Sequence, residues 1–177
     1  ELIVMDREMQ LSTRDGVFYI TDDRGRALSE NTVNGWTHVK AVQDGETYRV
    51  LFQDAESGLW RDMTVAADGT LQADGITTGA VALARLEAVY GDVDGSGSVA
   101  VMPANPEITV LDRALVLSTA TGDLSITDER GRDIRDSVLR DVTVLKAIAD
   151  DAGYRVLLRD GDGLLTEWVL DDSGART

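Results

Sequence analysis

The sequence contains no cysteine, only two prolines and a single histidine, and it has no apolar run long enough to form a membrane-spanning helix. The absence of cysteine excludes disulfides, thiol nucleophiles and thiolate metal sites. The absence of a long apolar run predicts that the chain does not insert into a membrane. Aromatic residues are also few, with three Trp, four Tyr and two Phe. Leu, Ile, Val and Met must therefore fill most of any core.

Basic residues are in a minority, because 17 Lys and Arg stand against 32 Asp and Glu, which gives a net charge of -15. A chain of this charge repels phosphate backbones, so we expect no nucleic-acid partner. One interpretation of the acidity is solubility. The other is that some of the carboxylates bind divalent cations.

Residues 1–54 and 107–160 align without a gap at a constant offset of 106, with 23 identical positions. The pattern predicts two β units, residues 1–78 and 107–177, joined by a connector, residues 79–106. Tandem repetition favours a binding or spacer module over an enzyme, because a catalytic site is rarely needed twice. Since Glu1 is already in register with Glu107, we expect the chain to be a piece of a longer array.

Short segments of alternating polar and apolar residues, separated by Asp/Gly turns such as residues 15–16 and 44–45, recur in both halves. This alternation is typical of a meandering antiparallel sheet. We therefore predict a mainly β fold of two tandem antiparallel meander units. The expected strands are residues 9–13, 17–21, 26–28, 36–42, 48–52 and 59–65 in the first unit, and 115–119, 124–127, 142–148, 154–158 and 164–170 in the second.

The connector breaks the alternating pattern. Residues 79–90 place Val81, Leu83, Leu86 and Tyr90 among alanines, which predicts an amphipathic helix of about three turns. The Asp/Gly-rich segment that follows, residues 91–99, resembles the loop of an EF-hand. Two interpretations remain open for it, a calcium-binding loop and a flexible linker.

The calcium interpretation depends on spacing. The side chains of Asp92, Asp94 and Ser96 stand at alternate positions, and Ser98 would contribute its main-chain carbonyl. Such a loop brings alternate oxygens onto one cation. Gly97 at the sixth position would permit the sharp turn.

Two later positions bear on how such a loop would close. An apolar residue, Val99, occupies the eighth position and is expected to anchor the loop to the core. The twelfth position, where a bidentate carboxylate should close the shell, is Pro103. Glu87, Glu107, waters or a residue elsewhere in the fold would therefore have to complete the coordination.

The segment from Leu86 to Gly97, Leu-Glu-Ala-Val-Tyr-Gly-Asp-Val-Asp-Gly-Ser-Gly, resembles the motif that ends the tryptophan-rich repeat of bacterial surface and exported proteins. Residues 48–51, Trp60 and the turn at residues 68–69 are similar to other parts of that repeat, as is Trp36 in its local context. The resemblance implies a repeated β module in exported, often calcium-associated proteins, without an established activity. The sequence departs from the repeat at Ser96, where the family carries Asp, and at Val142, which replaces Trp36 in the second unit.

Three functional hypotheses follow. The first is a non-catalytic structural or adhesive repeat of a secreted or cell-surface bacterial protein, stabilised by Ca²⁺ at Asp92, Asp94, Ser96 and Ser98. Its partners would be other repeats of the same protein, or a surface glycan or protein. The second is a carbohydrate- or protein-binding accessory module of an exported enzyme, with Trp36 or Trp60 as a stacking surface. The third is a hydrolase that uses aspartates, which would need carboxyl groups of raised pKa in a cleft.

Two smaller features have ordinary explanations. His38 corresponds to Val144 in the second half, so we expect it to be a common strand residue rather than a metal ligand. The duplicated segments 22–26 and 128–132 combine acidic residues, Arg and Gly. They are interpreted either as salt-bridged turns or as ligand-contacting loops presented once per unit.

Overall fold

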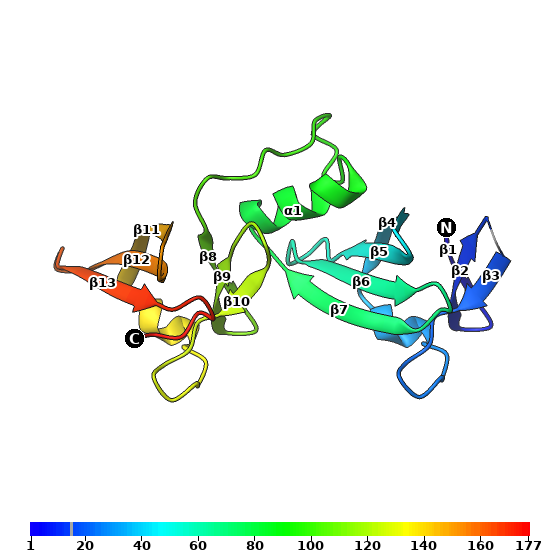
Figure 1. Ribbon diagram of the computed structural model, residues 1–177, viewed down its shortest axis with the longest axis horizontal. Coiled ribbons are helices and arrows are strands. Elements are labelled where there is room, and N and C mark those ends of the chain that lie inside the picture. The colour runs from blue at the N-terminus through cyan, green and yellow to red at the C-terminus, as the bar shows by residue number, and fades with distance from the viewer. Residues whose placement is uncertain (15) are drawn as a thin grey trace. The chain divides into compact units, whose positions relative to one another are not determined.

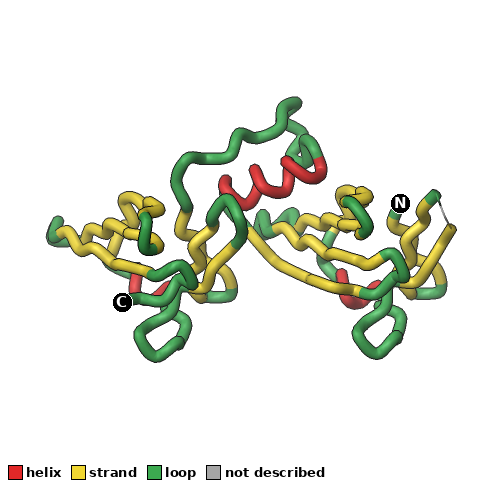
Figure 2. The backbone as a smooth tube through the Cα atoms, viewed as in Figure 1, coloured by secondary structure: helices red, strands yellow, loops and turns green. Residues whose placement is uncertain are grey.

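The computed structural model describes residues 1–14 and 16–177, and within them the fold is mainly β, with antiparallel strands arranged in four sheets (Figure 1). The prediction of a mainly β chain with a short helix is confirmed. Strands and turns make up most of the tube in Figure 2, and the described residues contain one α-helix. The chain divides into two compact units. Unit 1 comprises Glu1–Thr77 and Glu87–Val99, and unit 2 comprises Thr78–Leu86 and Ala100–Thr177.

Unit 1 begins with a three-stranded sheet of β1 (Leu2–Met5), β2 (Glu8–Thr13) and β3 (Gly16–Tyr19). A two-residue turn joins β1 to β2, because Met5 pairs with Glu8. Its residues, Asp6 and Arg7, have positive φ of 52° and 68°. Two consecutive left-handed residues produce the type of turn whose twist matches that of a hairpin.

The second sheet of unit 1 has the order β4-β5-β6-β7, and a 3₁₀ turn, η1 (Glu30–Val33), precedes it. Val50 and Phe52, two residues apart, face the core, and Tyr48 packs against it, as the alternation predicts. The sheet strands are β4 (Thr37–Asp44), β5 (Thr47–Gln53), β6 (Trp60–Ala66) and β7 (Leu71–Thr77). The core consists of Met9, Leu11, Ile20, Val50, Phe52, Met63 and Val65.

Unit 2 has a sheet of order β10-β9-β8 and a sheet of order β11-β12-β13, with η2 (Asp136–Leu139) between them in the chain. Its strands are β8 (Glu107–Leu111), β9 (Ala114–Ser118), β10 (Asp123–Ser125), β11 (Val142–Asp150), β12 (Gly153–Asp160) and β13 (Leu165–Leu170). Aliphatic residues and Trp168 form the core: Leu115, Leu117, Ile126, Ile134, Ala147, Val156, Leu158, Trp168 and Leu170.

The two units use equivalent hydrogen bonds at corresponding positions. The Ile20 amide donates to the Met9 carbonyl at 2.9 Å, and the Ile126 amide donates to the Leu115 carbonyl at the same distance. Other correspondences are the parallel bridges Thr21–Thr70 and Thr127–Ala175, the strand irregularities at His38/Lys40 and Val144/Lys146, and the positive φ values of Asp6, Arg7, Asp112 and Arg113.

Some strand predictions differ from the structure. Residues 26–28, expected to form a strand, form an isolated bridge between Thr21 and Ala27 instead, and the Leu28 backbone bonds to Met9 and Ile20. Strands β1, β7 and β8 were not expected. The turn predicted at residues 15–16 includes Asp15, which lies outside the described residues. The division into residues 1–78, 79–106 and 107–177 stays a prediction.

Candidate functional site

The N-terminus of helix α1 (Ala80–Tyr90) is capped by a carboxylate from β8. Glu107 Oε2 accepts hydrogen bonds from the amides of Ala80 at 2.8 Å and Val81 at 3.3 Å. These amides have no partner within the helix, and the negative charge is favourable at the positive end of the helix dipole. Glu107, one of the residues considered for completing a calcium shell, is therefore engaged at the start of the helix.

The C-terminus of α1 leads directly into the candidate loop. Gly91 has φ +76° and its amide donates to the Glu87 carbonyl at 2.8 Å, which ends the helix in the left-handed conformation that glycine favours. The Glu87 side chain is only 1% exposed, and its Oε1 accepts from the amide of Val93 at 3.1 Å. A buried carboxylate requires such donors. Glu87 thus fixes how the loop leaves the helix.

Backbone amides of the loop hold Asp92 and Asp94 in place. Asp92 accepts from the Gly95 amide at 2.9 Å through Oδ1 and from the Gly97 amide at 2.8 Å through Oδ2. Asp94 Oδ1 accepts from the Ser96 amide at 2.9 Å, and this hydrogen bond is the main cause that lowers the pKa of Asp94. The positive φ values of Gly95 and Gly97, 76° and 83°, allow the chain to fold around these carboxylates.

One carboxylate oxygen from each of Glu87, Asp92 and Asp94 lies within 4.8 Å of the other two. Oxygens bound to one Ca²⁺ at about 2.3–2.6 Å are separated by comparable distances, so the three groups can meet a single hard cation. The donor set is all oxygen, which suits Ca²⁺ or Mg²⁺ and not a soft transition metal. Sequence spacing indicated Asp92 and Asp94. Glu87 was considered only as an auxiliary ligand.

The remaining predicted loop residues are arranged differently. Ser96 Oγ donates to the Ser98 carbonyl at 3.0 Å, so these two predicted ligand oxygens are bonded to each other. Pro103 is exposed. Val99 is 50% exposed, so the expectation that it anchors the loop to the core is wrong. The loop is held by the buried Glu87 carboxylate instead of by an apolar side chain.

The two tryptophans proposed for ligand stacking have different environments. Trp60, in β6, is 5% exposed, so its ring offers almost no surface to a ligand. Trp36, immediately before β4, is partly buried against the core of unit 1, and the Arg61 guanidinium lies 6.0 Å from its ring centroid. Trp36 is therefore the more accessible of the two.

The duplicated acidic and basic segments form salt-bridged turns. In the first, Asp22 accepts from the amides of Arg24 and Arg26, each at 2.9 Å, and from Arg26 Nε at 2.8 Å. Asp128 and Arg132 make the same contacts in unit 2. These hydrogen bonds lower the pKa of Asp22 and of Asp128 to about 2. The salt-bridged interpretation of these segments is the one that the structure supports.

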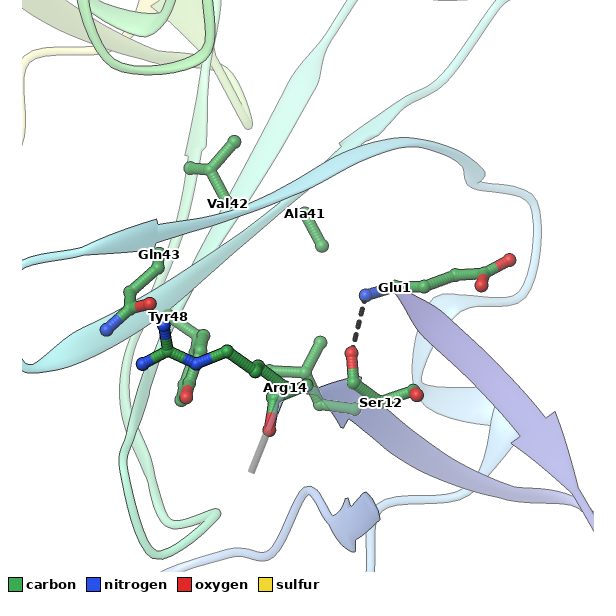
Figure 3. A pocket seen from close by; sticks show the side chains of 9 residues that line it. Glu1, Ser12, Arg14, Ala41, Val42, Gln43 and Tyr48 are labelled. Carbon is green, nitrogen blue, oxygen red and sulfur yellow. Dashed lines mark hydrogen bonds between the residues drawn. The ribbon is translucent and has the colours of Figure 1, made fainter. Parts of the chain in front are cut away.

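Figure 3 shows a pocket in unit 1 where the amino group of Glu1 donates to the Ser12 carbonyl at 2.7 Å. Its volume is about 260 Å³. Sites for small molecules usually measure about 300–1,000 Å³, so this pocket is small for a substrate. Its lining residues are Glu1, Leu11, Ser12, Thr13, Arg14, Ala41, Val42, Gln43 and Tyr48.

No sequence pattern indicated the binding site for Tyr90 on the sheet of unit 1. Tyr90, the last residue of α1, donates from its hydroxyl to Asp62 Oδ1 at 2.7 Å, and its ring centroid lies 5.6 Å from the Arg49 guanidinium. Lys40 Nζ donates to the Tyr90 main-chain carbonyl. Lys40, Leu51 and Asp62 are directly paired across β4, β5 and β6. We call these residues, with Arg49, the tyrosine cradle of unit 1.

No family model matches the chain, and no curated protein or solved structure does. The resemblance to the tryptophan-rich repeat accordingly stays a prediction. Among the described residues, no helix is both long and apolar enough to cross a membrane.

Proposed function

We propose that the chain is a non-catalytic structural or adhesive repeat module of a secreted or cell-surface bacterial protein, stabilised by Ca²⁺ at the loop after α1. The observation that carries this proposal is the recurrence of one hydrogen-bond framework in both units. The corresponding amides of Ile20 and Ile126 donate to the corresponding carbonyls of Met9 and Leu115. A repeated framework that preserves backbone bonds, while side chains on its surface vary, is typical of modules whose role is architectural.

The ionisation of the aspartates favours the same conclusion. Each aspartate with a perturbed pKa among the described residues has it lowered, mainly because turn amides, a serine hydroxyl or an arginine bind the carboxylate. A general acid needs the opposite, a carboxyl group whose pKa is raised by burial or by a neighbouring negative charge. These aspartates therefore serve turns better than they would serve hydrolysis.

The calcium component of the proposal rests on Glu87, Asp92 and Asp94. Three carboxylates confined within 4.8 Å repel one another, and a divalent cation would relieve that repulsion. Ser96, Ser98 and water are the candidates for the remaining coordination positions. The loop is open, and the protein supplies only part of the coordination shell. We therefore expect weak affinity for Ca²⁺, with a Kd on the order of 10⁻⁴–10⁻³ M, as in extracellular modules.

Isothermal titration calorimetry with CaCl₂, paired with thermal unfolding, tests the calcium component. At about 10 mM Ca²⁺ we expect a stabilisation of roughly 1.4–2.7 kcal/mol for a Kd of that order. Asp92→Asn should abolish both the heat and the stabilisation. Asp171→Asn is the matched control, because Asp171 accepts from the Ser173 amide in an exposed turn of the same kind. Equal responses in both variants, or no heat in the unmodified chain, would remove calcium from the proposal.

The accessory-module alternative depends on Trp36, since Trp60 is buried. Affinity electrophoresis through gels that contain bacterial or plant polysaccharides distinguishes the two functions. Retardation that disappears in Trp36→Ala would favour the accessory module. Identical migration of the original chain and Trp36→Ala through every gel is the result that the structural or adhesive module predicts.

A further inference from the structure

The tyrosine cradle of unit 1 has a counterpart in unit 2. Lys146, Leu157 and Glu167 are directly paired across β11, β12 and β13, as Lys40, Leu51 and Asp62 are across β4, β5 and β6. We call Lys146, Leu157, Glu167 and the neighbouring Arg155 the second cradle.

The ion pairs around the two arginines also correspond. Arg155 Nη1 lies 3.2 Å from Glu167 Oε2, while Arg155 Nε lies 2.6 Å from Asp150 Oδ2. In unit 1, Arg49 pairs with Asp62 and with Asp44. The second cradle therefore has the same charges in the same strand register.

The two cradles differ in what covers them. In unit 1 the central leucine, Leu51, is 0% exposed, and Tyr90 contacts the residues on either side of it. In unit 2 the central leucine, Leu157, is 37% exposed. Lys146, Arg155 and Glu167 are exposed as well. An apolar residue surrounded by one lysine, one arginine and one carboxylate is thus presented to solvent on β11–β13.

We propose that the second cradle binds the C-terminal turn of an amphipathic helix that ends in tyrosine, with the pattern Leu-Glu-Ala-Val-Tyr-Gly found at the end of α1. The tyrosine ring would cover Leu157 beside the Arg155 guanidinium, and its hydroxyl would donate to Glu167. Lys146 would donate to the main-chain carbonyl of the tyrosine. That carbonyl has no amide partner at the end of a helix, so a lysine is a suitable donor for it.

Charge and exposed apolar surface support this occupant. Lys146 supplies a cation for the helix C-terminus, where the dipole is negative, and Glu167 supplies an acceptor for a phenolic hydroxyl. Leu145 and Val169, 41% and 37% exposed on the flanking strands, are further exposed apolar side chains in this sheet. The proposal goes beyond the proposed function, because it stands on the side chains of β11–β13 whether or not the loop binds calcium.

A peptide with the sequence of residues 79–91, acetylated and amidated, tests the proposal when it is titrated into the ¹⁵N-labelled 177-residue chain and followed by NMR. The peptide omits Asp92 and Asp94, and the buffer contains chelator, so a failure of the calcium site cannot affect the result. We expect shifts centred on the amides of Lys146, Leu157 and Glu167. The Kd should be on the order of 10⁻⁴ M, because an isolated helix of this length is only partly formed in water.

Leu157→Asp is the matched variant of the protein, since Leu157 is partly exposed and the change leaves the core intact. It should weaken binding at least tenfold. A peptide with Phe in place of the tyrosine should bind the unmodified chain about tenfold more weakly, because it lacks the hydrogen bond to a carboxylate.

Three results would overturn the proposal. The first is the absence of shifts in the second cradle at about 1 mM peptide, and the second is equal binding by the unmodified chain and Leu157→Asp. The third is a dimer, detected by analytical ultracentrifugation, that dissociates in Leu157→Asp, because the cradle would then be occupied by a second copy of the chain.

Discussion

Replacing Tyr90 by Phe removes one hydroxyl from the tyrosine cradle of unit 1 and leaves the ring. Tyr90 is 2% exposed, and its hydroxyl donates to Asp62 Oδ1 at 2.7 Å. A hydrogen bond to a charged acceptor contributes about 1.5–3 kcal/mol. Because Arg49 also binds Asp62, the carboxylate keeps a partner and the lower end of this range applies. We expect a loss of about 1.5 kcal/mol, or roughly 3–6 °C in the melting temperature of a chain of this length.

The same substitution changes the response to alkaline pH. Burial raises the pKa of Tyr90 above its ordinary value. In the unfolded chain the phenol loses its proton near pH 10, whereas in the folded chain it stays protonated to higher pH. The stability that Tyr90 contributes is therefore complete below about pH 9 and declines as the pH rises through 10. The difference between the original chain and Tyr90→Phe should narrow between about pH 9 and pH 11.

Urea unfolding followed by circular dichroism at several pH values measures both effects. Tyr19→Phe is the control, because Tyr19 lies on β3 and is 48% exposed. It should change the free energy of unfolding by less than about 0.5 kcal/mol. If Tyr90→Phe matched the original chain in stability and in its alkaline response, the hydrogen bond to Asp62 would not exist and the cradle would be misassigned.

Two further predictions concern turns. The pKa of Asp128 is lowered to about 2, chiefly by the Arg132 side chain. The stability that the Asp128 carboxylate contributes is therefore present above about pH 4 and lost as the pH falls toward 2. An NMR titration midpoint near pH 4 for the carboxyl carbon of Asp128 would contradict this. Gly69→Ala should destabilise the chain by about 3 kcal/mol or more in chemical unfolding, because the added Cβ would lie 2.3 Å from the Tyr19 carbonyl oxygen. Gly45 has φ +60° and open space around it, so Gly45→Ala should lower the free energy of unfolding by only about 1 kcal/mol. Equal losses of stability in Gly45→Ala and Gly69→Ala would show that the close approach at Gly69 is wrong.

The centres of most strands could be predicted from sequence because period-two alternation reflects which face is buried. Two of the strands that were not predicted, β1 and β7, lack an ordinary sequence signal, each for its own reason. The β1–β2 turn uses Asp6 and Arg7 in left-handed conformation, where glycine or asparagine is common, so no punctuation marks the end of β1. In β7, the Ala-Asp-Gly run at residues 73–75 lacks the β-branched residues that indicate a strand.

The candidate site was partly predictable for a similar reason. The spacing of Asp92 and Asp94 is local, so the sequence indicated both. The burial of Glu87 depends on how the chain folds back after Gly91, which no local pattern encodes. Leu51 lies between the core residues Val50 and Phe52, so alternation puts its side chain on the opposite face of β5. It is nevertheless buried, and Tyr90, far away in sequence, contacts the residues that flank it on the neighbouring strands.

The central claim is that the two halves of the chain are built on one repeated β framework. Scalar couplings across hydrogen bonds, measured by NMR, identify donor and acceptor residues directly. We predict a coupling between the Ile20 amide nitrogen and the Met9 carbonyl carbon, and a matching one between Ile126 and Leu115. The claim would be contradicted if the coupling were present in one unit only, and the corresponding amide of the other unit were bonded to a carbonyl elsewhere in the chain.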